Sequence, residues 1–120
     1  MPFSNLLDLL CRLFACDYSE IAEKLKDPEN RKTVEDILKR EDVDARLDGK
    51  WIHVESEGLT DDPIEKINCR KHGLPVLEEY LYNYNLEVTY KDLPCVISKD
   101  NNGDRYYVPL EIIVVTPILT

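Results

Sequence analysis

The sequence predicts an α+β domain in which a helical part, residues 1–42, precedes a small bent β-barrel, residues 43–120. In the first third of the chain, apolar residues recur every three or four positions, which is the period of a helix. From Val43 onward they alternate in short runs, which is the period of a strand. Tight-turn signals such as Asp48-Gly49 separate these runs, and one further helical segment interrupts them.

Two or three helices are expected in the first part. Ser4 is a candidate N-cap for the first helix, and the second falls within residues 17–26. The third has the clearest start, because Asp27 can cap it and Pro28 suits its first position. The residues expected on the apolar faces are Leu6, Leu7, Leu10, Leu13, Phe14, Ile21, Ala22, Leu25, Val34, Ile37 and Leu38.

The second part is expected to form short strands joined by turns. Val43, Ala45 and Leu47 alternate with polar residues, and Asp48-Gly49 then supplies a hairpin turn. Residues 57–73 are polar and are expected to form an irregular loop. A helix follows in the prediction at residues 74–85, and the strands after it are residues 86–90, 95–99, 105–108 and 111–115.

Two prolines interrupt apolar runs in this second part. They lie in the stretches Leu93–Val96, with the sequence LPCV, and Tyr106–Glu111, with the sequence YYVPLE. Because proline cannot donate to a sheet ladder, it is expected at edges and corners of a sheet. Pro94 and Pro109 are therefore predicted to mark two corners of the barrel.

The composition is that of one globular domain without a membrane span. The chain has 120 residues, of which 43% are hydrophobic. No apolar run approaches the ~18 residues that a membrane-spanning helix needs. The net charge is −9, and residues 43–65 alone hold seven acidic and two basic side chains. An acidic chain is a poor non-specific ligand of nucleic acid, because attraction to phosphate supplies most of that affinity.

The sequence contains no recognisable catalytic or metal-binding pattern. His53 is interpreted as a packed or surface histidine, and neither it nor His72 lies at zinc-ligand spacing from the cysteines. No phosphate-binding glycine loop or metalloprotease motif is present. We therefore predict that the protein is not an enzyme and needs no cofactor or metal. The cysteines Cys11, Cys16, Cys69 and Cys95 are expected to be reduced, mostly buried thiols of a cytosolic or nuclear protein.

Tyrosine stands out in the composition, since seven occur and three of them lie within residues 80–84. Tyr80 and Tyr84 are four positions apart and share a face of the predicted helix, whereas Tyr82 points elsewhere. One interpretation is that one ring packs in the core and the others decorate the helix end. The other is that the pair holds a phosphate or stacks on a base. Candidate neighbours in the fold are Lys50, Trp51, Lys66, Arg70 and Lys71.

Residues 79–115 resemble the second half of the PAZ domain of Argonaute and Piwi proteins. The matching pattern is a helix ending in a tyrosine, an aromatic residue, a Leu-Pro-Cys block, a hairpin and a Tyr-x-Pro-Leu-Glu block. In this chain the pattern falls on Tyr80 and Tyr84, Tyr90, Leu93–Cys95 and Tyr107–Glu111. The first half of the chain is similar to the family in the order of its elements.

The resemblance implies that residues 1–120 form a single PAZ-like domain with a bent barrel of the OB or SH3 type. A hairpin–helix module folds over this barrel, and the cleft between them takes the 3′ end of a single-stranded small guide RNA. Tyr80 and Tyr84 would contact the terminal phosphate. Trp51 or Ile52 would be the strand aromatic position. Lys50 would be the basic neighbour, and Tyr82 is a further candidate on the helix.

The implied setting is RNA silencing, as one module of a larger Argonaute or Piwi chain. The expected partner is single-stranded small RNA, with no membrane contact. The expected location is the cytoplasm, with the nucleus and germ granules as alternatives.

Departures from the family pattern support an alternative function. The family's histidine in the first strand falls on Arg46 or Leu47, and the phenylalanine of its inserted module falls near Ile67 or Cys69. At roughly 1 kcal/mol per hydrogen bond and 1–3 kcal/mol per stacked base, these losses weaken RNA binding by several kcal/mol. The alternative is a domain that keeps the fold but uses its acidic surface to bind a protein partner.

Overall fold

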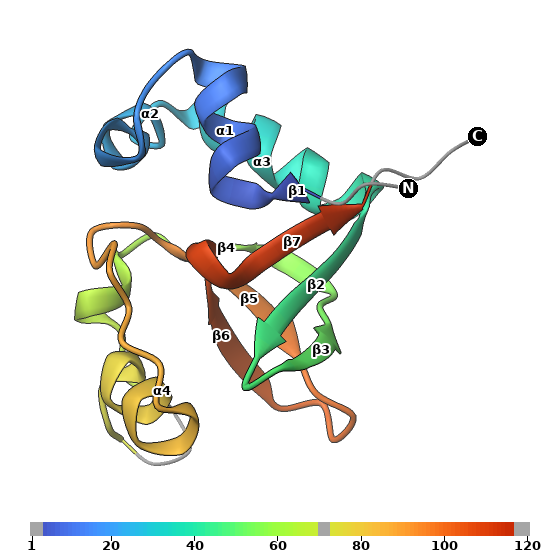
Figure 1. Cartoon of the computed structure of the whole chain (residues 1–120), viewed down its shortest axis with the longest axis vertical. Coiled ribbons are helices and arrows are strands. Elements are labelled where there is room, and N and C mark those ends of the chain that lie inside the picture. Colours follow the sequence, from blue (N-terminus) through green and yellow to red (C-terminus); the bar gives the residue numbers. More distant parts are fainter. Residues whose placement is uncertain (1–3, 70–72, 117–120) are drawn as a thin grey trace.

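The computed structural model describes residues 4–69 and 73–116. The helices of the first part gather at one end of the molecule, the later helix lies at the other end, and the strands lie between them (Figure 1). The helices are α1 (Leu6–Phe14), α2 (Ile21–Lys24), α3 (Pro28–Arg40) and α4 (Val76–Tyr84), with 3₁₀ turns η1 (Tyr18–Glu20), η2 (Ile64–Lys66) and η3 (Leu110–Ile112). The strands are β1 (Ser4–Asn5), β2 (Asp42–Leu47), β3 (Lys50–His53), β4 (Ser56–Leu59), β5 (Cys95–Lys99), β6 (Arg105–Pro109) and β7 (Ile113–Thr116).

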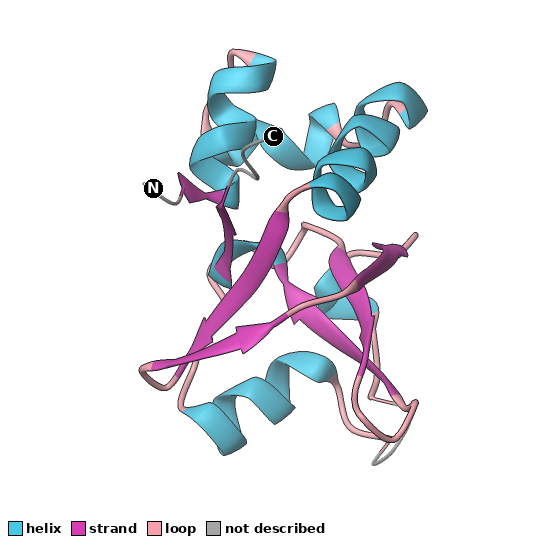
Figure 2. Ribbon diagram, turned by 90° about the vertical axis from the view of Figure 1, so that its right-hand side faces the viewer, coloured by secondary structure: helices cyan, strands magenta, loops and turns pink. Residues whose placement is uncertain are grey.

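The strands form two antiparallel sheets, one in the order β1-β7-β2-β3 and the other in the order β4-β5-β6. Figure 2 shows these strands crossing one another between the helices of the first part and α4. The predicted α+β class is confirmed. The barrel, however, is open within the described residues, because β3 and β6 each form the edge of their own sheet. Two strand edges are therefore available beside α4.

The helix starts follow local capping chemistry. Asp27 caps α3 as predicted, since its carboxylate accepts the backbone N–H of Glu29 at 2.9 Å and Pro28 opens the helix. The predicted cap of α1 was wrong by one residue. The side chain of Asn5 accepts the N–H of Leu7 at 2.9 Å, whereas Ser4 pairs with Val115 in the sheet.

The core divides into two clusters of buried side chains. The larger lies between the first three helices and the strands and includes Leu10, Val34 and Ile113. The smaller seats α4 on the strands and consists of Leu47, Ile64, Val76, Tyr80, Val88 and Cys95. Leu13, expected on the apolar face of the first helix, is half exposed. Of the cysteines, Cys95 is buried, and the other three are partly exposed rather than buried.

Residues 86–90 form no strand, which corrects the prediction made from their alternating pattern. The backbone N–H groups of Thr89 and Tyr90 donate to the carboxylate of Glu111, at 3.0 and 2.9 Å, instead of to a neighbouring strand. An alternating pattern shows that a segment has one apolar and one polar face. A strand also needs a neighbouring strand whose backbone accepts its N–H groups, and here a side-chain carboxylate accepts them instead. Glu111 thereby holds this segment to η3.

The first part of the predicted loop, residues 57–73, contains regular structure, since β4 begins at Ser56 and pairs with β5, and η2 follows it. The alternation of apolar and polar residues is interrupted at Gly58, whose φ of +123° lies in the region that favours glycine. The register shifts between Ser56 and Leu59, which is the mark of a bulge. This bulge hides the strand from a search for alternating residues.

The two prolines lie at strand ends. Pro94 directly precedes β5, and Pro109 is the last residue of β6 before η3. Cys95 and Pro109 are paired in register, so both prolines lie at the same end of the β5–β6 hairpin.

Within the described residues, no helix is both long enough and apolar enough to span a membrane.

The anchoring role of Glu111 predicts a loss of stability on truncation. Replacing Glu111 by alanine removes the acceptor of two neighbouring N–H groups, and we expect the free energy of unfolding to fall by about 1–3 kcal/mol. Urea denaturation followed by the fluorescence of Trp51 measures this change. Glu87→Ala is the matched control in the same region, since Glu87 is exposed, and it should change stability by no more than about 0.5 kcal/mol. Equal effects of the two substitutions would contradict the assignment.

Candidate functional site

A groove of about 530 Å³ lies where α4 faces the open edges of the two sheets. One wall is helix α4, and the other is formed by the edge strands β3 and β6 with the turn that joins β5 to β6. The residues that line it are Ile52, His53, Cys69, Val76, Glu79, Tyr80, Asn83, Tyr84, Lys99, Asp100, Asn101, Tyr106 and Tyr107. Four tyrosines contribute to its walls.

Tyr80 forms part of the groove wall, but its side chain is buried and its hydroxyl is not free to bind a ligand. Its side chain is only 7% exposed, and its hydroxyl donates to the backbone carbonyl of Tyr107 at 2.6 Å. Burial raises the pKa of this hydroxyl well above the usual value for tyrosine. Because its single proton is used within the protein, Tyr80 cannot donate to a phosphate while this bond is intact.

Tyr84 presents the accessible aromatic surface of the predicted pair. It ends α4 and is 42% exposed, and its ring lies 5.6 Å from the ring of Tyr80, measured between centroids. The helix stops directly after it, because Asn85 adopts a left-handed conformation with φ of +51°. Tyr82 is 76% exposed and does not line the groove. The helix thus brings Tyr80 and Tyr84 together and leaves Tyr82 outside.

Trp51 and Lys50 lie outside the groove. Trp51 lines a separate hollow of about 340 Å³, where the guanidinium of Arg46 lies 5.6 Å from its ring centroid. Lys50 begins β3 and is exposed, opposite Leu47 in the hairpin. Of the two positions that the resemblance offered for the strand aromatic, the structure places Ile52 at the groove. Lys66 lies in η2 and does not line the groove, and Arg70 and Lys71 lie outside the described residues.

Part of the groove wall was not predicted from the sequence, namely Tyr106, Tyr107 and the side chains of the β5–β6 turn. The proline of the stretch YYVPLE predicted a barrel corner, whereas the two adjacent tyrosines of the same stretch form part of the aromatic wall. His53 also lines the groove, in keeping with a packed or surface position. Only the tertiary arrangement brings β3 and β6 to the same helix.

The charged side chains of the groove are largely paired within the protein. Lys99 forms an ion pair with Glu57 at 3.2 Å, and the Nδ1 atom of His53 lies 3.5 Å from Asp44. The carboxylate of Asp100 accepts the N–H groups of Asn102 and Asp104 in the turn. The groove therefore offers aromatic surface, hydroxyls and amides rather than a concentration of positive charge.

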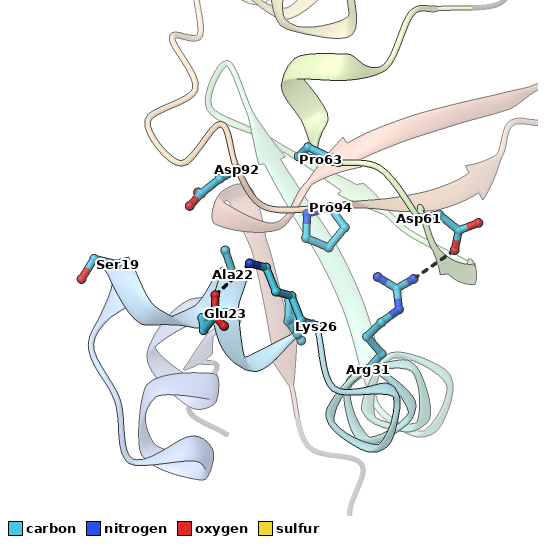
Figure 3. Close-up of a pocket in the computed structure, with 10 residues that line it drawn as sticks. Ser19, Ala22, Glu23, Lys26, Arg31, Asp61, Pro63, Asp92 and Pro94 are labelled. Atoms are coloured by element: carbon cyan, nitrogen blue, oxygen red, sulfur yellow. Dashed lines mark ion pairs between the residues drawn. The ribbon is translucent and has the colours of Figure 1, made fainter.

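A second cavity, of about 570 Å³, lies between α2, the start of α3 and the segments that precede η2 and β5 (Figure 3). Both of its basic side chains are paired within the protein: Lys26 with Glu23 at 2.9 Å, and Arg31 with Asp61 at 3.8 Å. Arg31 further donates to the carbonyl oxygen of Thr60 at 3.0 Å, which ties α3 to the end of β4. Its lining residues come from both parts of the domain, so this cavity lies at the junction between them, and none of these residues is aromatic.

Comparison with solved structures identifies the arrangement. No protein-family model matches the sequence, and the search of curated proteins found no significant match. A Drosophila Argonaute PAZ domain in complex with 3′-end 2′-O-methylated RNA superposes with a TM-score of 0.67 at 12% identity, covering 96% of this chain and 99% of that one. The chain has the fold of a PAZ domain.

Two further structures agree with this assignment of the fold. The Drosophila Argonaute 2 PAZ domain, in a structure that concerns 3′ end recognition of nucleic acids, gives a TM-score of 0.65 at 13% identity, covering 93% of each chain. A second structure of that domain, which concerns nucleic acid binding, gives a TM-score of 0.54 at 15% identity, covering 73% of this chain and 79% of that one. The PAZ-like fold inferred from residues 79–115 is therefore confirmed.

The bond from Tyr80 predicts a stability difference in this PAZ-like domain. Tyr80→Phe leaves the carbonyl of Tyr107 without its donor, so the free energy of unfolding should fall by about 1–3 kcal/mol. Tyr82→Phe is the matched control on the same helix, because the Tyr82 side chain is largely exposed. Urea denaturation of both variants at neutral pH checks this, and an unchanged stability of Tyr80→Phe would show that the bond contributes nothing.

The same bond predicts a pH dependence. Because the pKa of Tyr80 is raised in the folded state, its contribution to stability is fully present below the pKa of about 10 that an unfolded tyrosine has. As the pH rises above about 10, the unfolded state ionises first and that contribution is lost. The stability advantage of the wild type over Tyr80→Phe should therefore shrink above pH ~10. A constant difference between pH 8 and 11 would contradict it.

Proposed function

We propose that this PAZ-like domain binds the 3′ end of single-stranded RNA in the groove between α4 and the edges of β3 and β6. The observation that carries the proposal is the half-exposed ring of Tyr84 in an aromatic groove, in a fold whose solved examples are described as recognising 3′ ends. Aromatic rings suit an RNA end, because an unpaired base stacks on them without regard to its sequence.

Each part of the groove has a separate role in this proposal. The ring of Tyr84 stacks on a base or sugar, and its hydroxyl is available as a donor at the open end of the helix. The amides of Asn83 and Asn101 lie in opposite walls and can hydrogen-bond a ribose or phosphate between them. Tyr80 acts as a positioning residue, since it holds α4 against β6 and sets the width of the groove.

The proposed setting is a small guide RNA held by a larger Argonaute or Piwi chain in RNA silencing, in the cytoplasm, the nucleus or germ granules. In that setting the domain is a binding module and carries out no reaction. Support comes from the solved structures above, all of which are Argonaute PAZ domains.

The paired charges predict that RNA binding depends little on salt. With about one phosphate neutralised, the affinity should fall only about two- to threefold between 50 and 200 mM salt, whereas a site that contacts many phosphates loses orders of magnitude. Fluorescence anisotropy of a labelled single-stranded RNA at the two salt concentrations measures this. A steep salt slope would show that the RNA lies on basic residues outside this groove.

End recognition predicts that a linear single-stranded RNA binds and that the same sequence joined into a circle does not. Tyr84→Ala should weaken binding of the linear RNA by about 5- to 150-fold, which corresponds to one lost stacking contact. Tyr82→Ala is the control on the same helix and should bind like the wild type. Equal binding of linear and circular RNA, or an unaffected Tyr84→Ala, would overturn the proposal.

A specific observation favours a second candidate function, the binding of a protein partner. The carboxylates of Glu79 and Asp100 line the groove together with its tyrosines, and aromatic rings beside carboxylates suit a lysine or arginine side chain. The net charge of −9 attracts a basic partner in the same way.

Titration with an arginine-containing peptide distinguishes protein binding from RNA binding. Saturable peptide binding that Tyr84→Ala abolishes, without RNA binding, would favour the protein partner.

A further inference from the structure

The end of α1 brings two cysteines together. Ala15 adopts a left-handed conformation with φ of +51°, and its N–H donates to the carbonyl oxygen of Cys11. The N–H of Cys16 donates to the same oxygen at 3.1 Å. The bond from the Cys16 N–H is the 6→1 bond of a Schellman motif, and a contact between the residue after the left-handed position and the residue five positions before it frequently accompanies this motif. Here the side chains of Cys11 and Cys16 are near enough to interact.

The two thiols are accessible to a small reagent. Both are free and partly exposed, and both pack against the margin of the larger core cluster rather than inside it. The side chains of Cys11 and Cys16 interact. Burial raises the pKa of the Cys11 thiol, and Cys16 and the carboxylates of Asp8 and Asp17 add to this, so alkaline pH favours the thiolate that attacks a disulfide. By contrast, Cys95 is fully buried in the smaller cluster, and a buried thiol is inert.

We propose that Cys11 and Cys16 form a modification site, a dithiol that small disulfides such as glutathione disulfide oxidise to an intrachain Cys11–Cys16 disulfide. A disulfide needs the Cα atoms of its two cysteines within roughly 7 Å of each other. The hydrogen bond from the amide of Cys16 to the carbonyl of Cys11 brings the two backbones close enough for this bond.

The reaction proceeds by thiol–disulfide exchange and balances without a further reactant. One cysteine thiolate attacks a sulfur of glutathione disulfide, forms a mixed disulfide and releases one glutathione. The second thiolate then attacks the cysteine sulfur of that mixed disulfide and releases the second glutathione. Two protein thiols are oxidised, and one glutathione disulfide is reduced to two thiols. The site lies at the opposite end of the molecule from α4, so it is separate from the groove (Figure 1).

The sequence makes this disulfide simple to detect. Trypsin cleaves after Arg12, between the two cysteines, so a Cys11–Cys16 bond joins the peptides 1–12 and 13–24. The full chain is incubated with glutathione disulfide at pH 8, alkylated, digested without reductant and examined by mass spectrometry. The proposal predicts the joined peptides in the wild type. In Cys11→Ser and in Cys16→Ser, it predicts a glutathione adduct trapped on the remaining cysteine.

The native fold should matter to this reaction. The joined peptides should form at about tenfold lower glutathione disulfide in the folded protein than in 8 M urea, because the helix cap holds the thiols together. This comparison uses the wild type alone and stands even where a serine variant fails to fold. Separate glutathione adducts on Cys11 and Cys16 without joined peptides would overturn the proposal, as would equal yields with and without urea.

Discussion

The hydrogen bond from the Tyr80 hydroxyl to the Tyr107 carbonyl is the contact on which the groove depends. β6 is an edge strand, and this bond supplies a donor to one carbonyl of that edge from helix α4. The small cluster around Tyr80, Val76 and Cys95 adds apolar contact below it. Because β3 and β6 belong to different sheets, the space between them stays open, and α4 covers it without filling it.

Most residues of the sequence motif that resembles the PAZ domain have a structural role in this scaffold. Tyr80 holds the helix, and Glu111 accepts the N–H groups of the segment that leaves the helix. Pro94 and Pro109 lie at one end of the β5–β6 hairpin. These positions maintain the geometry of the groove, whereas its accessible surface comes from residues such as Tyr84 and Asn101. A chain can therefore keep the motif while the chemistry of its groove changes.

Local sequence signals predicted the elements that local chemistry determines. Asp27 with Pro28 located the start of α3, and the Asp48-Gly49 turn, in which both residues have positive φ, located the β2–β3 hairpin. The pattern failed at residues 86–90, where a carboxylate distant in sequence replaces a partner strand. The site was predictable only in outline, since the spacing of Tyr80 and Tyr84 shows that they share a face but not which hydroxyl is already bonded.

The most direct test of the account is to locate the RNA on the domain by residue. Titrating the ¹⁵N-labelled domain with a short single-stranded RNA, followed by amide chemical shifts, reports on the groove and on the second cavity in the same spectrum. The account predicts that the largest shifts fall on His53, Tyr84, Asn101 and Tyr106, with little change around Lys26 and Arg31. Shifts concentrated at that second cavity, or an unchanged spectrum at millimolar RNA, would contradict it.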